Sequence, residues 1–308
     1  MKEGGPVMSD NKEALVLASF AGDSLALGLH WIYSTRRIAE EFGRVDTFLK
    51  PHADSHHRSK ERGEFTHYGD QTLVLLQSIA EKKAFDPEDF SLRWQALFAD
   101  YKGYYDQATR DTLDNFSKGA SPEESGSSSN DIAGAARIAP VVYCHRDDLD
   151  TLILSARAQT SMTHADPLVV DSAELFARVT YKVLKGDSPT NAVSVEAEEY
   201  FAGTPFPSWV DAGVRSAARD SVEVIREFGR SCHTPEAFPG IIHLIAKYDM
   251  DLKEALVQSV MSGGDSAARA MIVGMILGAH LGMEALPDEW ITSMKKTEEI
   301  RFLLGQIR

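Results

Sequence analysis

Four short stretches of this chain combine small residues with acidic or basic side chains at places where helices are expected to begin or end. In chain order they are Gly22-Asp23-Ser24-Leu25 leading to His30, Tyr68-Gly69-Asp70-Gln71-Thr72, Thr163-His164-Ala165-Asp166-Pro167, and Gly263-Gly264-Asp265-Ser266 leading to Arg269. Each stretch alone fits a helix cap, because a side-chain oxygen there satisfies free backbone N–H groups. Four of them in one helical chain predict helix ends that converge on a polar cleft.

Asp70, Asp265 and His30 are the candidates for acid–base chemistry in this cleft. A carboxylate orients or activates water, and an imidazole titrates near neutral pH. Arg269 follows Asp265 by one helical turn, so the spacing predicts an ion pair between them and a fixed positive charge for an anionic substrate. His164, at the third helix start, is a further candidate for substrate binding.

The elements that must position these residues are predicted to be helices. Apolar residues repeat at helical spacing after Asn11, after Asp86-Pro87 and after Asp166-Pro167, and each of these starts carries a capping residue. Further helices fit residues 211–228, 235–248, 252–261, 265–281 and 287–307, and alternating strand patterns are nearly absent. We therefore predict an all-α, single compact multi-helix domain over residues 1–308, with residues 1–10 as a flexible N-terminus.

Two segments between the predicted helices are unusual. Residues 50–64 hold His52, His56 and His57, and a histidine pair can bind metal, although exposed loop histidines usually bind nothing. Residues 117–130 are rich in serine, which favours a mobile surface loop or, alternatively, a lid. Cys232-His233 resembles a nucleophile and its base, but neighbours in sequence seldom face each other.

The overall charge excludes several classes of partner. Lysine plus arginine total 32 and aspartate plus glutamate total 46, so the net charge is −14. Nucleic acids and anionic membranes are bound by basic surfaces, so neither is an expected partner. Cys144 and Cys232 are the only cysteines, which fits a reducing compartment. No signal peptide or membrane span is indicated, and we expect a cytoplasmic protein.

The order and spacing of the four stretches resemble the ADP-ribosylglycohydrolase fold family over nearly the full length. Within that family the chain is most similar to the J-crystallin-like branch, through Leu29-His30-Trp31-Ile32-Tyr33, Tyr68-Gly69-Asp70-Gln71-Thr72 and Gly263-Gly264-Asp265-Ser266-Ala267-Ala268-Arg269. The resemblance implies a compact all-α domain. It also implies that the loop before Gly134-Ala135-Ala136-Arg137 contacts the nucleotide-like part of a substrate, and this loop supplies Ser129, Asn130 and Asp131 here.

The same resemblance implies a metal site that has been partly lost. Hydrolases of the family hold two magnesium or manganese ions with Thr-Asp-Asp in the first motif and Asp-x-Asp-Thr in the last. The matching positions here are Gly69, Asp70 and Gln71, and then Asp265, Ala267 and Ala268, while the family's early Glu falls on His30. Asp70 and Asp265 are thus the remaining carboxylates, and we expect at most one weakly held ion.

Three functional hypotheses follow from this resemblance. The leading one is a hydrolase that cleaves a glycosidic or related bond in an ADP-ribose-like small molecule or an ADP-ribosylated target, with a degraded metal site. The alternative is a non-catalytic, ligand-binding or crystallin-like structural descendant. The third is an ordinary metal-dependent hydrolase in which Glu61, Glu64 or Asp131 supplies the missing ligands.

Overall fold

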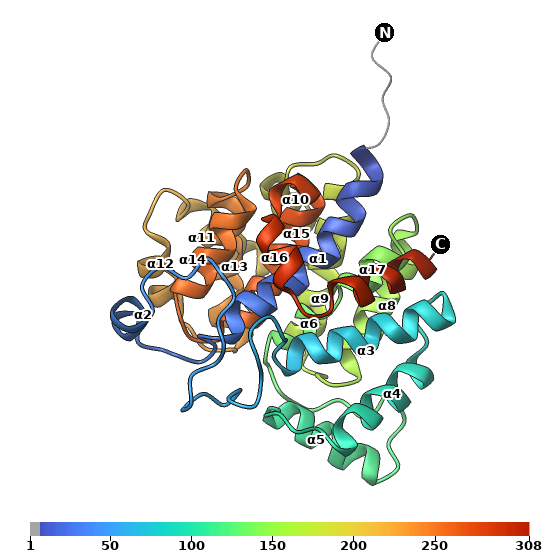
Figure 1. Ribbon diagram of the computed structural model, residues 1–308. Helices are drawn as coiled ribbons and strands as arrows, with labels where there is room; N and C mark the ends of the chain where they lie inside the picture. Colours follow the sequence, from blue (N-terminus) through green and yellow to red (C-terminus); the bar gives the residue numbers. More distant parts are fainter. Residues whose placement is uncertain (1–6, 308) are drawn as a thin grey trace.

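The protein is an all-α assembly, as predicted (Figure 1). The computed structural model describes residues 7–307; residues 1–6, which belong to the N-terminal segment expected to be flexible, and residue 308 lie outside it. Within the described range no strand forms, and extended pairing is limited to isolated bridges between Ser127 and His164 and between Asp131 and His233. The helices are α1 (Val7–Leu27), α2 (Thr35–Glu41), α3 (His67–Lys82), α4 (Pro87–Ala99), α5 (Gln107–Ser117), α6 (Ala133–Ala136), α7 (Ala139–Cys144), α8 (Leu149–Ser161), α9 (Pro167–Leu184), α10 (Pro189–Phe201), α11 (Phe206–Arg215), α12 (Ser221–Phe228), α13 (Thr234–Lys247), α14 (Leu252–Met261), α15 (Ser266–Leu281), the 3-10 turn η1 (Met283–Ala285), α16 (Asp288–Ser293) and α17 (Thr297–Gln306).

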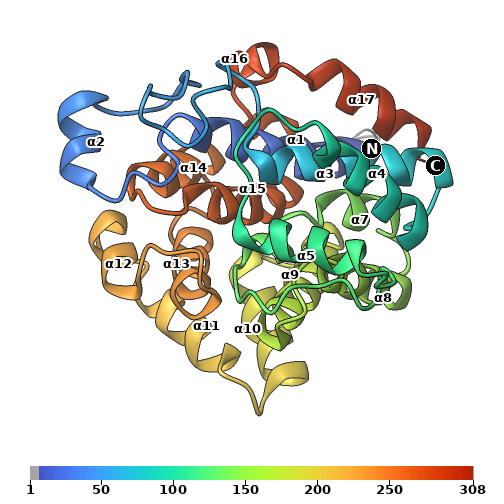
Figure 2. The ribbon, with the colours of Figure 1, turned by 90° about the horizontal axis from the view of Figure 1, so that it is seen from below.

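Helices α1 and α15 pack along each other and form the centre of the molecule (Figures 1 and 2). Small residues let the two backbones approach closely. A Cβ built on Gly274 would lie 2.4 Å from the Ala18 carbonyl oxygen, and one on Gly22 would lie 2.6 Å from the Ala270 carbonyl oxygen. The side chains of α15 are buried on every face from Ser266 to Ala279, and this stretch is accordingly apolar except for Ser266 and Arg269.

The remaining helices cover this central pair on different sides. Helices α9 and α13 pack against α15, with α8, α10 and α11 outside them, while α3 packs against α4 and α17. Figure 2 shows α16 and α17 along one edge and α10 and α11 along the opposite edge. The candidate site is built around the N-terminal ends of α3, α5, α13 and α15.

Several helix starts follow the capping signals in the sequence. The Asp86 carboxylate accepts from the Asp89 amide at 2.9 Å, and the Asp166 carboxylate accepts from the Leu168 amide at 2.9 Å. Asp23 has a different role, because it is buried inside α1 and accepts from the Thr66 amide at 2.7 Å and hydroxyl at 2.6 Å. Burial raises the pKa of Asp23 to about 7, and its two bonds join α1 to the start of α3.

Two of the expected long helices are divided in the structure. Residues 211–228 contain the end of α11 and the whole of α12, because the Asp220 carboxylate accepts from the Glu223 amide and starts a new helix. Residues 287–307 are divided into α16 and α17 at Met294, whose backbone is extended. Each helix break depends on one capping side chain or one extended residue, and the spacing of apolar residues does not reveal either of these.

The serine-rich segment is packed rather than exposed. Ser125 and Ser127 are buried, and their hydroxyls donate to the carbonyls of Met162 and Thr163 at 2.8 and 2.7 Å. The expectation of a mobile surface loop is therefore wrong for this part of the segment, because each serine satisfies backbone groups at the end of α8. Among the described helices, none combines the length and apolar character that crossing a membrane requires.

Candidate functional site

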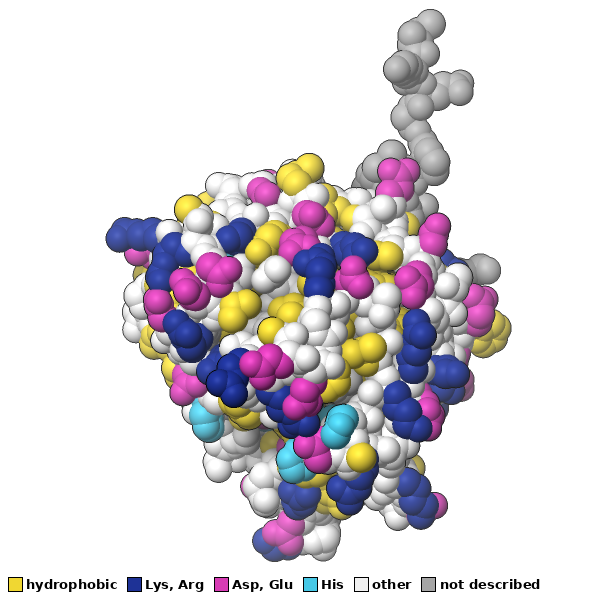
Figure 3. All heavy atoms as spheres, turned by 60° about the vertical axis from the view of Figure 1, so that its left-hand side comes forward, with side chains coloured by type: hydrophobic (Ala, Val, Ile, Leu, Met, Phe, Trp, Pro, Cys, Tyr) yellow, Lys and Arg dark blue, Asp and Glu magenta, His cyan; other side chains and the backbone are white. Residues whose placement is uncertain are grey.

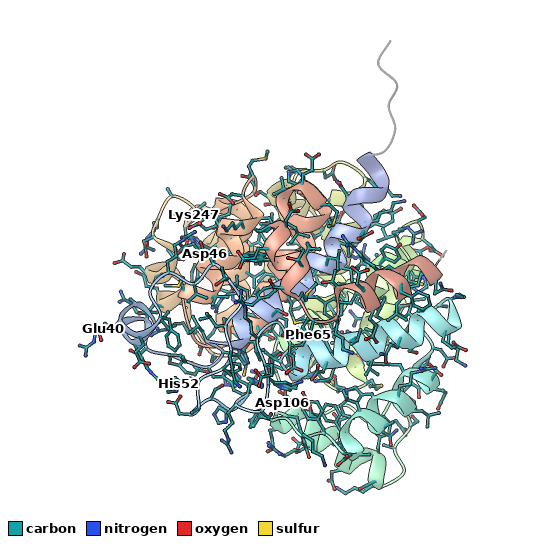
Figure 4. The ribbon with its side chains drawn as sticks, viewed as in Figure 1. Glu40, Asp46, His52, Phe65, Asp106 and Lys247 are labelled. Atoms are coloured by element: carbon teal, nitrogen blue, oxygen red, sulfur yellow. The ribbon has the colours of Figure 1, made fainter. Side chains whose placement is uncertain are left out.

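A cavity of about 480 Å³ opens where the loop after α1, the start of α5 and the start of α13 meet. This volume is typical of small-molecule sites. The side chains that line it are mostly aromatic or polar: Trp31, Tyr33, His56, Tyr104, Asp106, Gln107, Ala108, Ser129, Asp131, Cys232 and His233. Figure 4 labels Asp106, which lies below Phe65 and contacts His67 at the first position of α3.

Three side chains that can bind protons or metal ions gather at the inner wall of this cavity. A carboxylate oxygen of Asp131, the sulfur of Cys232 and a carboxylate oxygen of Asp265 all lie within 4.8 Å of one another. Asp131 and Cys232 line the cavity, whereas Asp265 is only 1% exposed and is not one of the lining residues. We refer to these three residues as the Asp–Cys–Asp triad.

Asp265 has one fully bonded carboxylate oxygen and one that has no partner. Its Oδ2 accepts from the Trp31 indole nitrogen and from the Tyr68 hydroxyl, both at 3.1 Å. Its Oδ1 is buried without a hydrogen-bond partner. Burial raises the pKa of Asp265, while the bonds from Trp31 and Tyr68 lower it by a smaller amount. Asp265 therefore keeps one buried carboxylate oxygen free to accept a further bond.

Backbone pairing places Asp265 beside the end of α1. The Trp31 amide donates to the Gly264 carbonyl at 2.9 Å, and the Gly264 amide donates to the Ile32 carbonyl at 3.0 Å. Trp31 and Gly264 both have positive φ, at 67° and 70°. At Gly264 this conformation needs glycine, since a Cβ would lie 2.1 Å from the Arg230 carbonyl oxygen. The double glycine thus fixes the direction in which Asp265 points.

Asp131 is brought to the triad by a short pairing between two loops. The Ile132 amide donates to the Cys232 carbonyl at 2.9 Å, and the Thr234 amide donates to the Asn130 carbonyl at 2.9 Å. The Asp131 carboxylate accepts from the Ala133 amide at 2.8 Å. Burial, followed by the negative charge of Asp265, raises the pKa of Asp131 well above its usual range. The two carboxyl groups therefore favour a state with at least one proton.

Asn130 and Ser129, the other residues expected to bind substrate in this loop, hold the loop in place. Asn130 Oδ1 bonds to His233 Nδ1 at 2.5 Å, and Ser129 Oγ accepts from the Asp131 amide at 3.2 Å. Ser129 also lines the cavity, together with His233. The loop before Gly134 is therefore part of the cavity wall.

His30 caps α15 from inside the protein. It is 3% exposed, and its Nδ1 accepts from the Ala267 amide at 3.4 Å, at a helix start where Asp265 makes no side-chain cap. Burial lowers the pKa of His30 well below its usual value, with nearby His67 and Arg269 acting in the same direction. The ring is thus a neutral capping group that does not line the cavity.

A cluster of imidazole and aromatic rings surrounds Trp31. The Trp31 ring stacks on His57 at a centroid distance of 5.5 Å and meets Tyr104 edge-on at 5.0 Å. His57 is fully buried and neither of its ring nitrogens has a hydrogen-bond partner. Its ring also stacks on His67 at 5.6 Å. The loop of residues 50–64 therefore contributes a buried histidine to the wall behind the cavity, besides the exposed His56.

Asp70 lies in a separate polar cluster. Its carboxylate pairs with Lys60 and accepts from the Tyr101 hydroxyl at 2.5 Å. The next residue, Gln71, turns into the core, where its Oε1 accepts from Trp94 at 2.7 Å and from Arg137 at 3.0 Å. Neither residue lines the cavity. The sequence predicted that Asp70 would share a cleft with Asp265. In the structure, Asp131 and Cys232 lie beside Asp265 instead.

The expected ion pair between Asp265 and Arg269 is wrong. The Arg269 guanidinium donates to the carbonyls of Ser259 and Gly263 at 2.7 and 2.8 Å, and its Nη1 has no partner. Burial lowers the pKa of Arg269 to about 10. Spacing along α15 did not lead to pairing because the end of α14 offers carbonyl acceptors. Arg269 therefore fixes the turn before Asp265 and does not line the cavity.

His164 is also part of the core. It is 2% exposed, its Nδ1 bonds to the Thr163 hydroxyl at 2.9 Å, and a Cβ on Gly134 would lie 2.7 Å from its ring. Burial lowers the pKa of His164 to about 3, and the charge of Arg137 acts in the same direction. The expected convergence of His30, Asp70, Asp265 and Arg269 on this cavity is accordingly not found, since none of the four lines it.

Comparisons with known proteins identify the family. The sequence profile of the ADP-ribosylglycohydrolase family matches residues 8–307, nearly the whole chain. This chain belongs to the ADP-ribosylglycohydrolase family. The chain is 23% identical to crystallin J1A of Tripedalia cystophora, over 94% of each chain. It is 26% identical to the ADP-ribosylhydrolase ARH3 of Homo sapiens, over 79% of this chain and 78% of that protein.

Two further relatives cover almost the full length. The ADP-ribosyl-[dinitrogen reductase] glycohydrolase of Rhodospirillum rubrum is 23% identical over 96% of this chain and 95% of that protein. A solved structure titled ADP-ribosylglycohydrolase-related protein complex superimposes with a TM-score of 0.76, at 21% identity and 97% coverage of both chains. The predicted family and its J-crystallin-like kinship are thus confirmed, and the relatives from Homo sapiens and Rhodospirillum rubrum are hydrolases by name.

Trp31, Tyr104, Asp106 and Cys232 are cavity residues that sequence reasoning did not select. Trp31 and Cys232 belong to two motifs considered in the sequence, Leu29-His30-Trp31 and Cys232-His233. Their distance along the chain gives no indication that they lie near Asp265. Tyr104 and Asp106 lie just before α5 in a Tyr-Tyr-Asp run, where the capping aspartate was the available signal. Asp131 was selected, and the structure places it beside Asp265.

Proposed function

We propose that this protein hydrolyses a glycosidic bond of an ADP-ribosyl group in the cavity above the Asp–Cys–Asp triad. The observation that carries the proposal is the buried pair of carboxyl groups, Asp131 and Asp265, at the wall of a small-molecule cavity. Hydrolases of the same family support the class of substrate. The substrate is a small ADP-ribose-like molecule or an ADP-ribosylated target.

The carboxyl pair suits the chemistry of glycosidic cleavage. Cleavage needs a proton for the leaving group and negative charge near the oxocarbenium-like sugar ring. A water then attacks the anomeric carbon and returns its proton to the carboxylate that acted as the acid. Two close, buried carboxyl groups resist losing both protons, so one remains an acid near neutral pH. Asp131 lines the cavity, and its raised pKa makes it the proton donor in this proposal. Asp265, held by Trp31 and Tyr68, supplies the charge that keeps Asp131 protonated.

The walls of the cavity suit the remainder of an ADP-ribosyl group. Trp31 and Tyr104 offer aromatic faces for a base or a sugar ring. Two arginines lie near the rim and suit a diphosphate: Arg110 lies over the Tyr104 ring at 5.5 Å, and Arg230 donates to the Tyr33 carbonyl at 2.5 Å. On the face drawn in Figure 3, basic and acidic side chains alternate without a broad basic patch, which favours a small anionic group over a polyanion.

We infer that the proposed reaction does not rest on the pair of magnesium or manganese ions implied by the family. Hard cations need several free oxygen ligands. Asp70 is occupied by Lys60 and Tyr101, Gln71 is bonded in the core, and Ala267 offers no side-chain oxygen. The first-motif and last-motif positions therefore do not fit a two-ion site, and every role proposed above belongs to the chain's own side chains.

The test is release of ADP-ribose from an ADP-ribosylated peptide, measured with Asp131→Asn beside the unaltered protein. Asn cannot donate a proton from a carboxyl group, so we expect turnover to fall by roughly 100-fold or more while ADP-ribose still binds. Asp114→Asn, which alters an exposed aspartate on α5 paired with Lys118, is the matched control and should leave turnover unchanged.

Two other results would exclude parts of the proposal. Full activity in Asp131→Asn would remove Asp131 as the proton donor. Binding of ADP-ribose with no release from any ADP-ribosylated peptide would favour the alternative of a non-catalytic, ligand-binding relative, for which the 23% identity to crystallin J1A is the supporting observation.

A further inference from the structure

We propose that the Asp–Cys–Asp triad binds a single thiophilic divalent cation of the zinc class. Two of its three ligands, Asp131 and Cys232, lie outside the motifs that resemble the family's metal-binding positions. The site therefore differs from the two-ion site of the family in both ligand type and number. It shares the cavity with the proposed hydrolysis, but it does not require that reaction.

The spacing of the three ligand atoms is close to that of a tetrahedral ion. Zinc holds cysteine sulfur at roughly 2.3 Å and carboxylate oxygen at roughly 2.0–2.2 Å, so tetrahedral ligand atoms lie roughly 3.3–3.7 Å apart. The ligand atoms of Asp131, Cys232 and Asp265 already lie within 4.8 Å of one another. Small side-chain rotations therefore suffice to complete the ligand set.

Asp265 also carries an unused ligand atom. The carboxylate is 1% exposed, its Oδ2 is taken by Trp31 and Tyr68, and its Oδ1 is buried with no hydrogen-bond partner. A buried acceptor without a partner costs free energy that a bound cation would recover. This orphan oxygen is the observation, independent of the clustering itself, that points to a ligand.

The charges of the three groups favour a cation in the same position. Burial raises the pKa of Asp131, Asp265 and Cys232, and nearby acidic groups raise those of Asp131 and Cys232 further. A divalent cation removes this mutual repulsion and releases the protons that the empty triad retains. The thiolate ligand selects zinc or cobalt over magnesium, which prefers an all-oxygen shell.

The number of ligands leaves one position for a small molecule. Three protein ligands with a further open position are typical of zinc sites that bind substrate or water, whereas closed structural sites use four. Asp131 and Cys232 line the cavity, so the open position faces it. A bound cation and a protonated Asp131 exclude each other. If the proposed hydrolysis also holds, zinc is therefore its inhibitor.

Cobalt binding tests this site without any measurement of turnover. The purified full chain is stripped with a chelator and titrated with Co²⁺ and, separately, with Zn²⁺ and Mg²⁺. We expect one Co²⁺ per chain, a near-ultraviolet thiolate-to-cobalt charge-transfer band, proton release, and a higher melting temperature with Co²⁺ or Zn²⁺ but not with Mg²⁺.

Matched cysteine variants decide which sulfur is the ligand. Cys232→Ser should abolish the charge-transfer band, whereas Cys144→Ser, which alters a cysteine beside the Lys83 carbonyl, should retain it. Asp131→Asn should weaken Co²⁺ binding at least tenfold. The proposal is overturned if stoichiometric Co²⁺ gives no thiolate band, if the band persists in Cys232→Ser, or if the unaltered chain binds neither Co²⁺ nor Zn²⁺ at micromolar concentration. None of these results bears on whether ADP-ribose is released in the absence of metal.

Discussion

The Trp31 indole nitrogen donates to Asp265 Oδ2 at 3.1 Å and so joins the loop after α1 to the start of α15. The Tyr68 hydroxyl, from α3, donates to the same oxygen at the same distance. Three segments that are distant in the sequence therefore meet at one oxygen atom. This meeting point orients the carboxylate that lies behind Asp131 and Cys232.

Trp31→Phe and Tyr68→Phe should each lower the free energy of unfolding by about 1–3 kcal/mol at neutral pH, because each removes a donor to a buried carboxylate. Urea unfolding measures this change. Tyr33→Phe is the control, since Tyr33 lines the same cavity and the residue is 48% exposed, so about 0.5 kcal/mol or less is expected. Equal losses in all three variants would show that the bonds to Asp265 contribute little.

Arg269→Met should lower the free energy of unfolding by roughly 2–3 kcal/mol. The substitution leaves the buried carbonyls of Ser259 and Gly263 without their guanidinium donor. Arg110→Met is the comparison, because Arg110 is exposed at the rim and should cost well under about 1 kcal/mol. Urea unfolding of both variants checks the difference, and an Arg269→Met protein as stable as Arg110→Met would contradict the role given to this arginine.

Gly274→Ala should destabilise the central helix pair by about 1–3 kcal/mol. The added methyl would lie 2.4 Å from the Ala18 carbonyl oxygen and would push α1 away from α15. Gly305→Ala, in α17, meets nothing within 4 Å and should instead raise the free energy of unfolding by about 0.5–1 kcal/mol. Thermal unfolding of the two proteins should therefore shift in opposite directions; a Gly274→Ala protein that melts no lower than the unaltered protein would contradict the close contact with α1.

His57→Phe should reduce the loss of stability in acid. Burial, together with the nearby His30 and His67, lowers the pKa of His57 well below its usual value, so the folded protein keeps this ring neutral. The unfolded chain takes up the proton below about pH 6.5, and the stabilising effect of the neutral ring is lost as the pH falls through that value. Between pH 8 and pH 5 we expect the unaltered protein to lose about 2 kcal/mol more than His57→Phe.

The comparison variant for this prediction is His56→Phe, which alters the exposed neighbour of His57. Urea unfolding at pH 8 and pH 5 measures both variants. Buried carboxyl groups with raised pKa act in the opposite direction, because Asp23 with a pKa of about 7 destabilises the fold as the pH rises toward that value. The comparison between variants removes this shared contribution, and an unchanged slope in His57→Phe would contradict the assignment.

Much of the fold could be predicted from local patterns in the sequence. Helical periodicity and capping aspartates such as Asp86 and Asp166 identify helices because these signals act over only a few residues. The divisions near Asp220 and Met294 escaped prediction because a helix break depends on a single competing cap or an extended residue. The family, likewise, could be identified from motif order and spacing.

The composition of the candidate site depended on tertiary structure. The sequence by itself determined an all-α chain of this family, and it indicated Asp265 and Asp131 as polar residues at loop and helix boundaries. Only the folded chain decided that Asp265 faces Asp131 and Cys232, that Arg269 binds the end of α14, and that Asp70 pairs with Lys60. The physical reason is that a buried charged group takes the partner that long-range packing brings within reach, and spacing along one helix cannot specify that partner.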